Sequence, residues 1–325
     1  MNGPADTPAH SLPRVTHVAT AVGSRSRTRR NLRAWGLAGL FMLPALALYA
    51  LFVLYPIVQA AHYSLYDWNG LEAMTDFVGI ANFQRALADP VFLGAISHNA
   101  LIVVLSLVVQ VPFALGIALM LNRRFFGRSI LRLIFFAPYV IAEVITAIVW
   151  SLILQPNGLA EHAMTTVGLG ELYQPWLADT DTVLIALFFI ITWKYFGFHM
   201  ILMLAGLQGI PREIEEAAAI DGASRRQSLR YVTLPLLGPT IRVSVFLSII
   251  GSVQLFDLVW VTTRGGPVNA SNTMGVYMFD RGFVRFQFGY GSAVAVILFL
   301  LCFVVALAYQ RWVMRRDTEG ATTYG

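Results

Sequence analysis

Three ionisable residues lie inside long apolar stretches of this 325-residue chain: Glu143, Lys194 and Asp257. A charged side chain at the centre of a bilayer costs at least ~2.5 to 3.5 kcal/mol on insertion scales, so such residues face a bundle interior, pair with one another or line a wet path. The sequence leaves two interpretations open. One is a polar route for a solute, and the other is structural ion pairing or side chains that reach the membrane interface.

Aromatic and hydrogen-bonding side chains accompany these charges. Tyr139 and Glu143 are four residues apart and therefore share one face of a helix. Aromatic faces with hydrogen-bonding groups suit a sugar, which presents apolar C–H faces and a rim of hydroxyl groups. Ordinary packing between helices is the alternative for each aromatic residue. The candidate path residues are Tyr139, Glu143, Lys194, Tyr195, Phe198, Ser252, Leu255 and Asp257.

Motifs for other chemistry are absent from the sequence. A P-loop needs a lysine after a glycine-rich turn, whereas Lys194, the only lysine, follows Trp193. Cys302 is the only cysteine, which excludes a disulfide framework or a cysteine metal site. The sequence contains no HExxH or GxSxG pattern, and its six histidines are scattered. We therefore expect no catalytic residue, no metal ligand set and no cofactor bound by this chain.

The composition is that of a membrane protein. Hydrophobic residues make up 57% of the chain and charged residues 13%, with a mean hydropathy of +0.65, whereas soluble domains carry about 25% charged residues. Six apolar runs are near or above the ~20 residues that cross a bilayer, and they must be helical to satisfy their backbone groups in lipid. We predict an all-α protein with six transmembrane helices. The runs are residues 35–61, 96–121, 131–154, 182–207, 241–262 and 290–314.

Three segments follow from this pattern. Residues 1–33 are polar and rich in Pro, Thr and Ser, and we expect a disordered basic tail. Residues 34–314 form the transmembrane domain, and residues 315–325 form a short tail. The first run is too long for the apolar part of a signal peptide, so we expect it to remain as a span. The outer connections, residues 63–93 and 155–181, are either plain linkers or short interfacial helices that meet an external partner.

The arginines give the orientation. If the N-terminus is inside, 18 arginines lie on the inner side and 4 on the outer side. The positive-inside rule then places both termini and the loop of residues 209–236 in the cytoplasm. The net charge of +5 could suggest nucleic-acid binding, but the arginines lie at the ends of the apolar runs, and we expect no nucleic-acid partner.

The cytoplasmic loop of residues 209–236 has the signals of two short helices separated by a bend. An alanine- and glutamate-rich helix is expected to end at Gly222 with a positive φ angle. Ser224 and Gln227 have the spacing of a capping box, which predicts the start of a second helix. We expect Pro235 to end this second helix.

This loop resembles the EAA loop of bacterial ABC importer permeases, whose pattern is E-A-A-x3-G-x9-I-x-L-P. The only departure is a valine in place of the isoleucine. The matching residues are Glu216, Ala217, Ala218, Gly222, Val232, Leu234 and Pro235. Residues 77–83 (FVGIANF) and 264–267 (RGGP) also resemble features of sugar-type permeases. The resemblance covers residues 35–314 and points to the class that includes the maltose- and glycerol-phosphate-type permeases.

The resemblance implies a permease subunit of an ATP-driven, binding-protein-dependent importer of a sugar or polyol in the bacterial cytoplasmic (inner) membrane. It implies a second permease subunit as heterodimer partner, two ATPase subunits or a homodimer of one that bind ATP and Mg, and an extracytoplasmic solute-binding protein. The path residues other than Asp257 match positions that line the sugar in maltose-type permeases. Glu143 and Lys194 differ in type, which leaves the substrate open.

Two rival functions remain at this point. One is a self-sufficient, proton-coupled secondary transporter that uses Glu143, Lys194 and Asp257 as a relay. It leaves the EAA-like pattern unexplained. The other is a membrane-embedded enzyme, for which the sequence shows no catalytic constellation.

Overall fold

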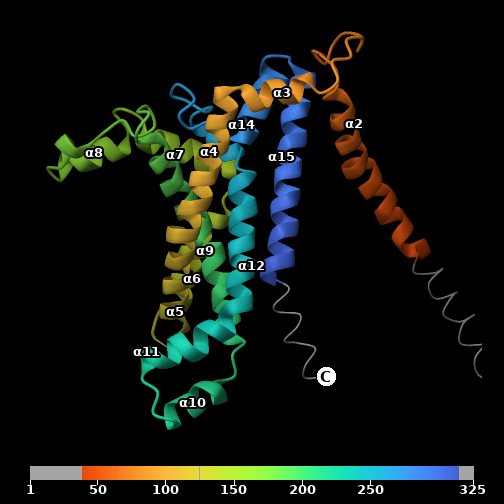
Figure 1. Cartoon of the computed structure of the whole chain (residues 1–325). Coiled ribbons are helices and arrows are strands. Elements are labelled where there is room, and N and C mark those ends of the chain that lie inside the picture. The colour runs from red at the N-terminus through yellow and green to blue at the C-terminus, as the bar shows by residue number, and fades with distance from the viewer. Residues whose placement is uncertain (1–38, 124, 315–325) are drawn as a thin grey trace, which may run out of the picture. The chain divides into compact units, whose positions relative to one another are not determined.

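The computed structural model of the chain describes residues 39–123 and 125–314 (Figure 1). The predicted tails, residues 1–33 and 315–325, lie outside this part. The described residues are helical and contain no strand, apart from one isolated bridge between Tyr66 and Phe77. The all-α prediction is confirmed for them. They form two units, one ending at Ile57 and the other beginning at Val58.

Five helices in the described residues are long and apolar enough to cross a membrane, or six if one bent pair counts as a span. This agrees with the six apolar runs of the sequence. The five are Gly39–Tyr63, which ends in α2 (Tyr55–Tyr63); Pro90–Asn122, which contains α4 (Pro90–Leu105) and α5 (Val111–Asn122); α9 (Val183–Gln208); Arg225–Val253; and Phe288–Met314, which contains α15 (Phe288–Tyr309).

The third predicted run, residues 131–154, is not one straight helix. It is the bent pair α6 (Arg128–Val140) and α7 (Glu143–Leu154), which meet at an angle of 97°. Ile141 is extended at the break, with φ −68° and ψ 135°. Pro138 lies three residues before the break and has no N–H to continue the helix ladder. The freed carbonyl of Ile141 accepts a hydrogen bond from Lys194 on α9.

The fifth predicted run, residues 241–262, is wrong at both ends. The span begins at Arg225, because α11 (Arg225–Ser228) passes through a π-helical turn, Leu229–Thr233, directly into α12 (Leu234–Val253). Pro235 therefore does not end the second helix of the loop. It occupies the first turn of α12, after the π-helical turn, where its lack of an N–H is tolerated.

At its C-terminal end the fifth span stops at Val253, and a separate short helix, α13 (Asp257–Thr262), follows. Asp257 is consequently the first residue of α13 and not part of a continuous fifth helix. Phe256, just before it, has φ −135° and ψ −67°, which is incompatible with an uninterrupted helix.

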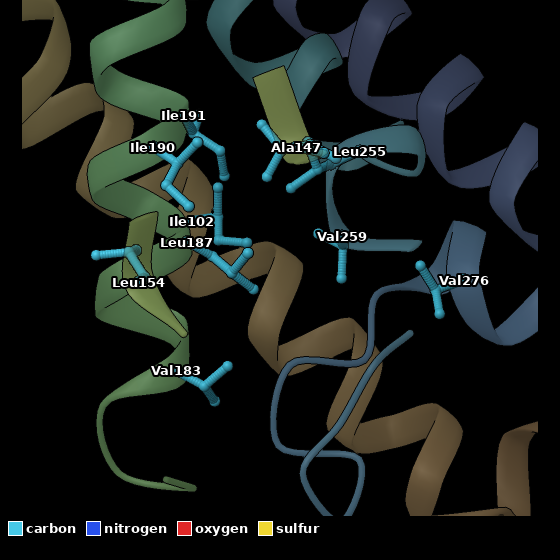
Figure 2. Packing of buried hydrophobic residues seen from close by; sticks show 11 residues of the cluster. Ile102, Ala147, Leu154, Val183, Leu187, Ile190, Ile191, Leu255, Val259 and Val276 are labelled. Atoms are coloured by element: carbon cyan, nitrogen blue, oxygen red, sulfur yellow. The ribbon is translucent and has the colours of Figure 1, made fainter. Parts of the chain in front are cut away.

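Helix α9 is the centre of the second unit. It packs against α5, α6 and α12, and it has the largest buried share of the candidate spans. Figure 2 shows one of its apolar clusters, in which Leu187 and Ile190 of α9 lie with Ile102 of α4 and Val259 of α13. A second cluster packs Met200 and other α9 residues against α5. The central position of α9 places its polar residues inside the bundle.

The connections of residues 63–93 and 155–181 contain short helices, α3 (Ala81–Ala88) and α8 (Leu159–Thr166), and are therefore not plain linkers. Another short helix, α14 (Met274–Phe279), lies between α13 and α15. Helices α3 and α14 lie at one end of the second unit in Figure 1, and the bent loop with α10 (Arg212–Ile220) and α11 lies at its other end.

Candidate functional site

A cavity of about 370 Å³ lies among α4, α6, α7, α9, α12 and α13. Seven of the eight predicted path residues line it, although they come from distant parts of the chain. They are Tyr139, Glu143, Tyr195, Phe198, Ser252, Leu255 and Asp257. The eighth, Lys194, lines an adjoining cavity together with Tyr139, Glu143 and Tyr195. The fold thus brings the predicted path residues together around two adjoining cavities.

The aromatic part of the pocket is a stacked wall. The ring of Tyr139, at the end of α6, stacks on Phe198 of α9 with centroids 4.8 Å apart and an interplanar angle of 24°. Tyr195 meets Tyr139 edge-on at 6.1 Å. Tyr139 is 37% exposed, so its ring offers surface to a bound molecule. A flat aromatic wall of this kind suits the apolar face of a sugar ring.

Glu143 begins α7, where the positive end of the helix favours a carboxylate. The hydroxyl group of Tyr195 donates a hydrogen bond to Glu143 Oε1. Tyr195 therefore fixes one oxygen of the carboxylate, and Glu143 keeps its other oxygen as an acceptor.

Lys194 is only 2% exposed. Its Nζ donates a hydrogen bond of 2.6 Å to the carbonyl oxygen of Ile141 at the α6–α7 break, and it lies 5.5 Å from the centre of the Tyr195 ring. The ammonium group thus stabilises the bent backbone of the pocket wall. This local role was not among the interpretations that the sequence suggested.

Four polar residues of the pocket were missed by sequence reasoning: Gln110, His199, Ser248 and Gln254. His199 Nδ1 lies 2.8 Å from Ser244 Oγ. Among the described residues, the buried Ser248 hydroxyl has no hydrogen-bond partner. A signal was present, because serines at 244, 248 and 252 recur every four residues and so share one face of α12.

The bend of the loop has two of the predicted local features, although its second helix does not end at Pro235. Gly222 has φ +83°, and Ser224 and Gln227 form the capping box. Glu216 and Ala217 are exposed on α10, and Ala218 is half-buried. Val232 and Leu234 are half-buried in the continuation toward α12, and Pro235 is exposed.

Large apolar side chains on this loop were not anticipated. Ile220 is 86% exposed, Tyr231 68% and Ile214 39%. Exposed apolar groups on an otherwise polar loop are typical of a contact surface for another protein. Ile214 and Ile220 belong to α10, and Tyr231 belongs to the π-helical turn after α11, so the loop exposes both charged and apolar groups.

A polar network closes the opposite end of the bundle. Asp89 caps α4 and accepts a hydrogen bond of 2.6 Å from the Tyr277 hydroxyl, with Arg281 Nη2 3.5 Å away. Burial alone would raise the pKa of Asp89. The hydrogen bonds from Tyr277 and two backbone N–H groups, with the charge of Arg281, outweigh burial and lower this pKa. The ionised carboxylate thus joins α4 to α14.

Residues 110–317 match the family described as "Binding-protein-dependent transport system inner membrane component". The chain belongs to this family, whose members are permease subunits of transporters and not enzymes. Sugar permeases are prominent among its relatives, which confirms the resemblance seen in the EAA-like loop.

Three of the relatives match most of this chain. The chain is 34% identical to a probable ABC transporter permease of Pyrococcus horikoshii, covering 84% of this chain and 94% of that protein. It is 32% identical to the diacetylchitobiose uptake system permease NgcF of Streptomyces coelicolor, with 82% and 79% covered. It is also 32% identical to the lactose transport system permease LacF of Rhizobium radiobacter, with 92% and 100% covered.

A solved structure has the same fold. It is a bacterial ABC transporter involved in the import of the acidic polysaccharide alginate, with a TM-score of 0.77 over 89% of this chain and 99% of that chain. The two sequences are 21% identical, so the likeness concerns the fold alone.

Proposed function

We propose that this chain is the membrane-spanning permease subunit of an ATP-driven, binding-protein-dependent importer that carries a sugar or related polyol across the bacterial cytoplasmic membrane. One observation carries the proposal beyond family membership. A polar, aromatic-walled pocket inside the bundle and an exposed bent loop at one end of it occur in the same unit of the chain. The first suits a polyhydroxylated solute, and the second suits a partner that supplies energy.

The loop of residues 209–236 is the proposed contact with an ATPase subunit, which holds ATP and Mg. The exposed carboxylate of Glu216 can pair with an arginine of that subunit. The small side chain of Ala217 permits close approach, and the φ of +83° at Gly222 makes the bend. Ile220, 86% exposed, adds apolar contact area.

The proposed cycle needs partners on both sides of the membrane. A second permease subunit completes a heterodimer. Two ATPase subunits, or a homodimer of one, bind on its cytoplasmic side. ATP binding closes the ATPase pair, moves the bent loops and shifts the bundle population from inward-facing to outward-facing. An extracytoplasmic solute-binding protein then delivers substrate. The related alginate transporter was solved with a periplasmic protein that carries an alginate pentasaccharide, which supports this arrangement.

The arginine distribution supports the proposed orientation, with both termini and the bent loop in the cytoplasm. Helices α3 and α14 lie at the end of the second unit opposite to the loop (Figure 1), which suits contact with an external protein. Cysteine labelling at Ile220 and Val268 with a membrane-impermeant reagent tests this orientation, because only Val268→Cys should react in intact cells.

The central test is a matched pair of charge insertions. Ile220 on the bent loop is 86% exposed, and Val268, in the connection between α13 and α14, is 87% exposed. Ile220→Asp should abolish co-purification with the ATPase, because it places a charge in an apolar contact. Val268→Asp has the same chemistry and exposure and should leave co-purification intact. Equal ATPase recovery with the two variants would refute the proposed docking surface.

Two further variants test coupling. Gly222→Pro removes the positive φ of the bend, and Glu216→Lys reverses the proposed charge contact. Both should insert normally but lose coupled uptake, and normal uptake by both would contradict the proposal. The rival secondary transporter predicts instead that a protonophore abolishes uptake and that the ATPase is not needed.

A further inference from the structure

The ionisable groups that reach the main pocket are carboxylates. Asp257 is exposed at the first position of α13, and Glu143 is half-buried at the first position of α7. Both line the cavity of about 370 Å³. Tyr195, between them in the lining, is within electrostatic range of each. The pocket therefore presents negative charge from two different helices.

Lys194 is within electrostatic range of Glu143 and offsets part of its charge, but it does not enter the main pocket. Lys194 is 2% exposed, and its Nζ is committed to the Ile141 carbonyl oxygen at 2.6 Å. It lines the adjoining cavity and not the main one. No lysine or arginine is among the described residues that line the main pocket. His199 does line it, and its Nδ1 is paired with the Ser244 hydroxyl.

The remaining polar groups of the pocket are neutral. The Ser248 side chain is 5% exposed, and its hydroxyl has no hydrogen-bond partner among the described residues. Gln254, which is exposed, lines the same cavity. A buried hydroxyl without a partner in a cavity wall is free to hydrogen-bond to a bound molecule or to water. Hydroxyl and amide groups complement the hydroxyl rim of a saccharide without requiring any charge on it.

We propose that this pocket admits saccharides that are uncharged or carry an ammonium group and rejects saccharides that carry carboxylate or phosphate groups. Asp257 is the residue that sets the preference, because it is the more exposed of the two carboxylates. The proposal deepens the proposed function and rests on it. An anionic substituent in this pocket would meet the carboxylate of Asp257 and that of Glu143, which Lys194 offsets in part. Even at a half-solvated site the repulsion from Asp257 weakens binding by about tenfold or more.

The fold of the permease does not by itself determine the charge of the saccharide that binds. The alginate importer shares the fold at a TM-score of 0.77, and its printed substrate is an acidic polysaccharide. The same arrangement of helices therefore occurs in an importer of an acidic polysaccharide. In this chain the lining has Glu143 and Asp257 at positions where acidic substrates would be repelled.

The test uses the full chain in its purified permease complex in nanodiscs, without a binding protein, so that only the pocket selects. Ligand-observed NMR measures the affinity of three matched disaccharides: cellobiose, its diamino analogue and its uronate analogue. The wild-type complex should bind the uronate at least tenfold more weakly than the diamino sugar. Asp257→Asn should reduce this ratio, and Asp257→Lys should reverse it.

The control is Glu171→Gln, which removes an exposed carboxylate in the connection between α8 and α9. It should leave the ratio unchanged. Equal binding of the three sugars by the wild type, an unchanged ratio in Asp257→Lys, or binding of none of the probes would overturn the proposal. ATPase co-purification is measured on the same samples. Its loss in the wild type would count against the proposed function, whereas intact co-purification without charge preference would count against this inference alone.

Discussion

The contact between α6 and α9 depends on a single glycine, Gly197. A Cβ atom added there would lie 2.0 Å from the carbonyl oxygen of Phe135 and 3.0 Å from the Cα atom of Phe136. Both are backbone atoms, so no flexible side chain can move aside. Because ordinary contact begins near 3.4 Å, Gly197→Ala requires α6 to move by more than 1 Å.

The expected cost follows from two opposing effects. Overpacking of a tight contact costs typically 1–3 kcal/mol, and a backbone clash belongs at the upper end. Replacing glycine by alanine inside a helix returns about 1 kcal/mol. We therefore expect Gly197→Ala to destabilise the protein by about 2 kcal/mol. It should also lower uptake, because a shift of α6 moves Tyr139 away from its stacked position on Phe198.

The matched control is Gly116→Ala on α5, where an added Cβ meets nothing within 4 Å. This variant gains the helix preference of alanine without the clash and should be neutral or slightly stabilising. Thermal unfolding of both purified variants, followed by fluorescence-detected size exclusion, should separate their Tm values by several degrees. Tm values within one degree of each other would show that the α6–α9 contact is looser than described and would refute the reasoning.

Three other perturbations have defined outcomes. Lys194→Met removes the donor to the Ile141 carbonyl and should lower the free energy of unfolding by about 1–3 kcal/mol, as seen in Tm; an unchanged Tm would mean that the α6–α7 break does not need this bond. Tyr277→Phe removes a 2.6 Å hydrogen bond to the Asp89 carboxylate and should lower the free energy of unfolding by about 1.5–3 kcal/mol, measured from Tm. An unchanged Tm would mean that water replaces the hydroxyl group. Because the pKa of Asp89 is lowered in the folded protein, its carboxylate stabilises the fold above the ordinary value of 3.8, and this contribution disappears as the pH falls through the lower folded value. Asp89→Asn should therefore lower Tm at pH 7 and have a smaller effect near pH 3, and a pH-independent effect would argue against the ionised form.

The spans were predictable because lipid imposes a simple rule. Any run long and apolar enough to cross must be helical, so length and composition located the runs. The details of the bent loop were equally local. Gly222 favours a positive φ angle because it has no Cβ, and the capping box of Ser224 and Gln227 is satisfied within four residues. Such features need no distant partner.

Where spans break was not predictable. The only charged residues in the apolar run of residues 131–154 are Arg132, near its start, and Glu143, yet the run bends by 97°. Pro138 indicates a point where the helix can break. The break is stabilised by a hydrogen bond from Lys194, which is distant in sequence. Pro235 was expected to end a helix, and a π-helical turn lets the helix continue instead. Both outcomes depend on how neighbouring helices cover freed backbone groups.

The sequence by itself determined the class of this protein, the approximate location of most of its spans and the types of side chain available for a solute path. Only the tertiary structure decided which of those side chains share a pocket and which charges they expose. Glu143, Lys194 and Asp257 are equivalent in sequence, as charges in apolar runs. In the folded chain Lys194 turns to a backbone carbonyl and the two carboxylates line the cavity. The physical reason is that burying a charge costs free energy unless the charge is paired or hydrogen-bonded. The packing of distant helices determines which partner is within hydrogen-bonding distance.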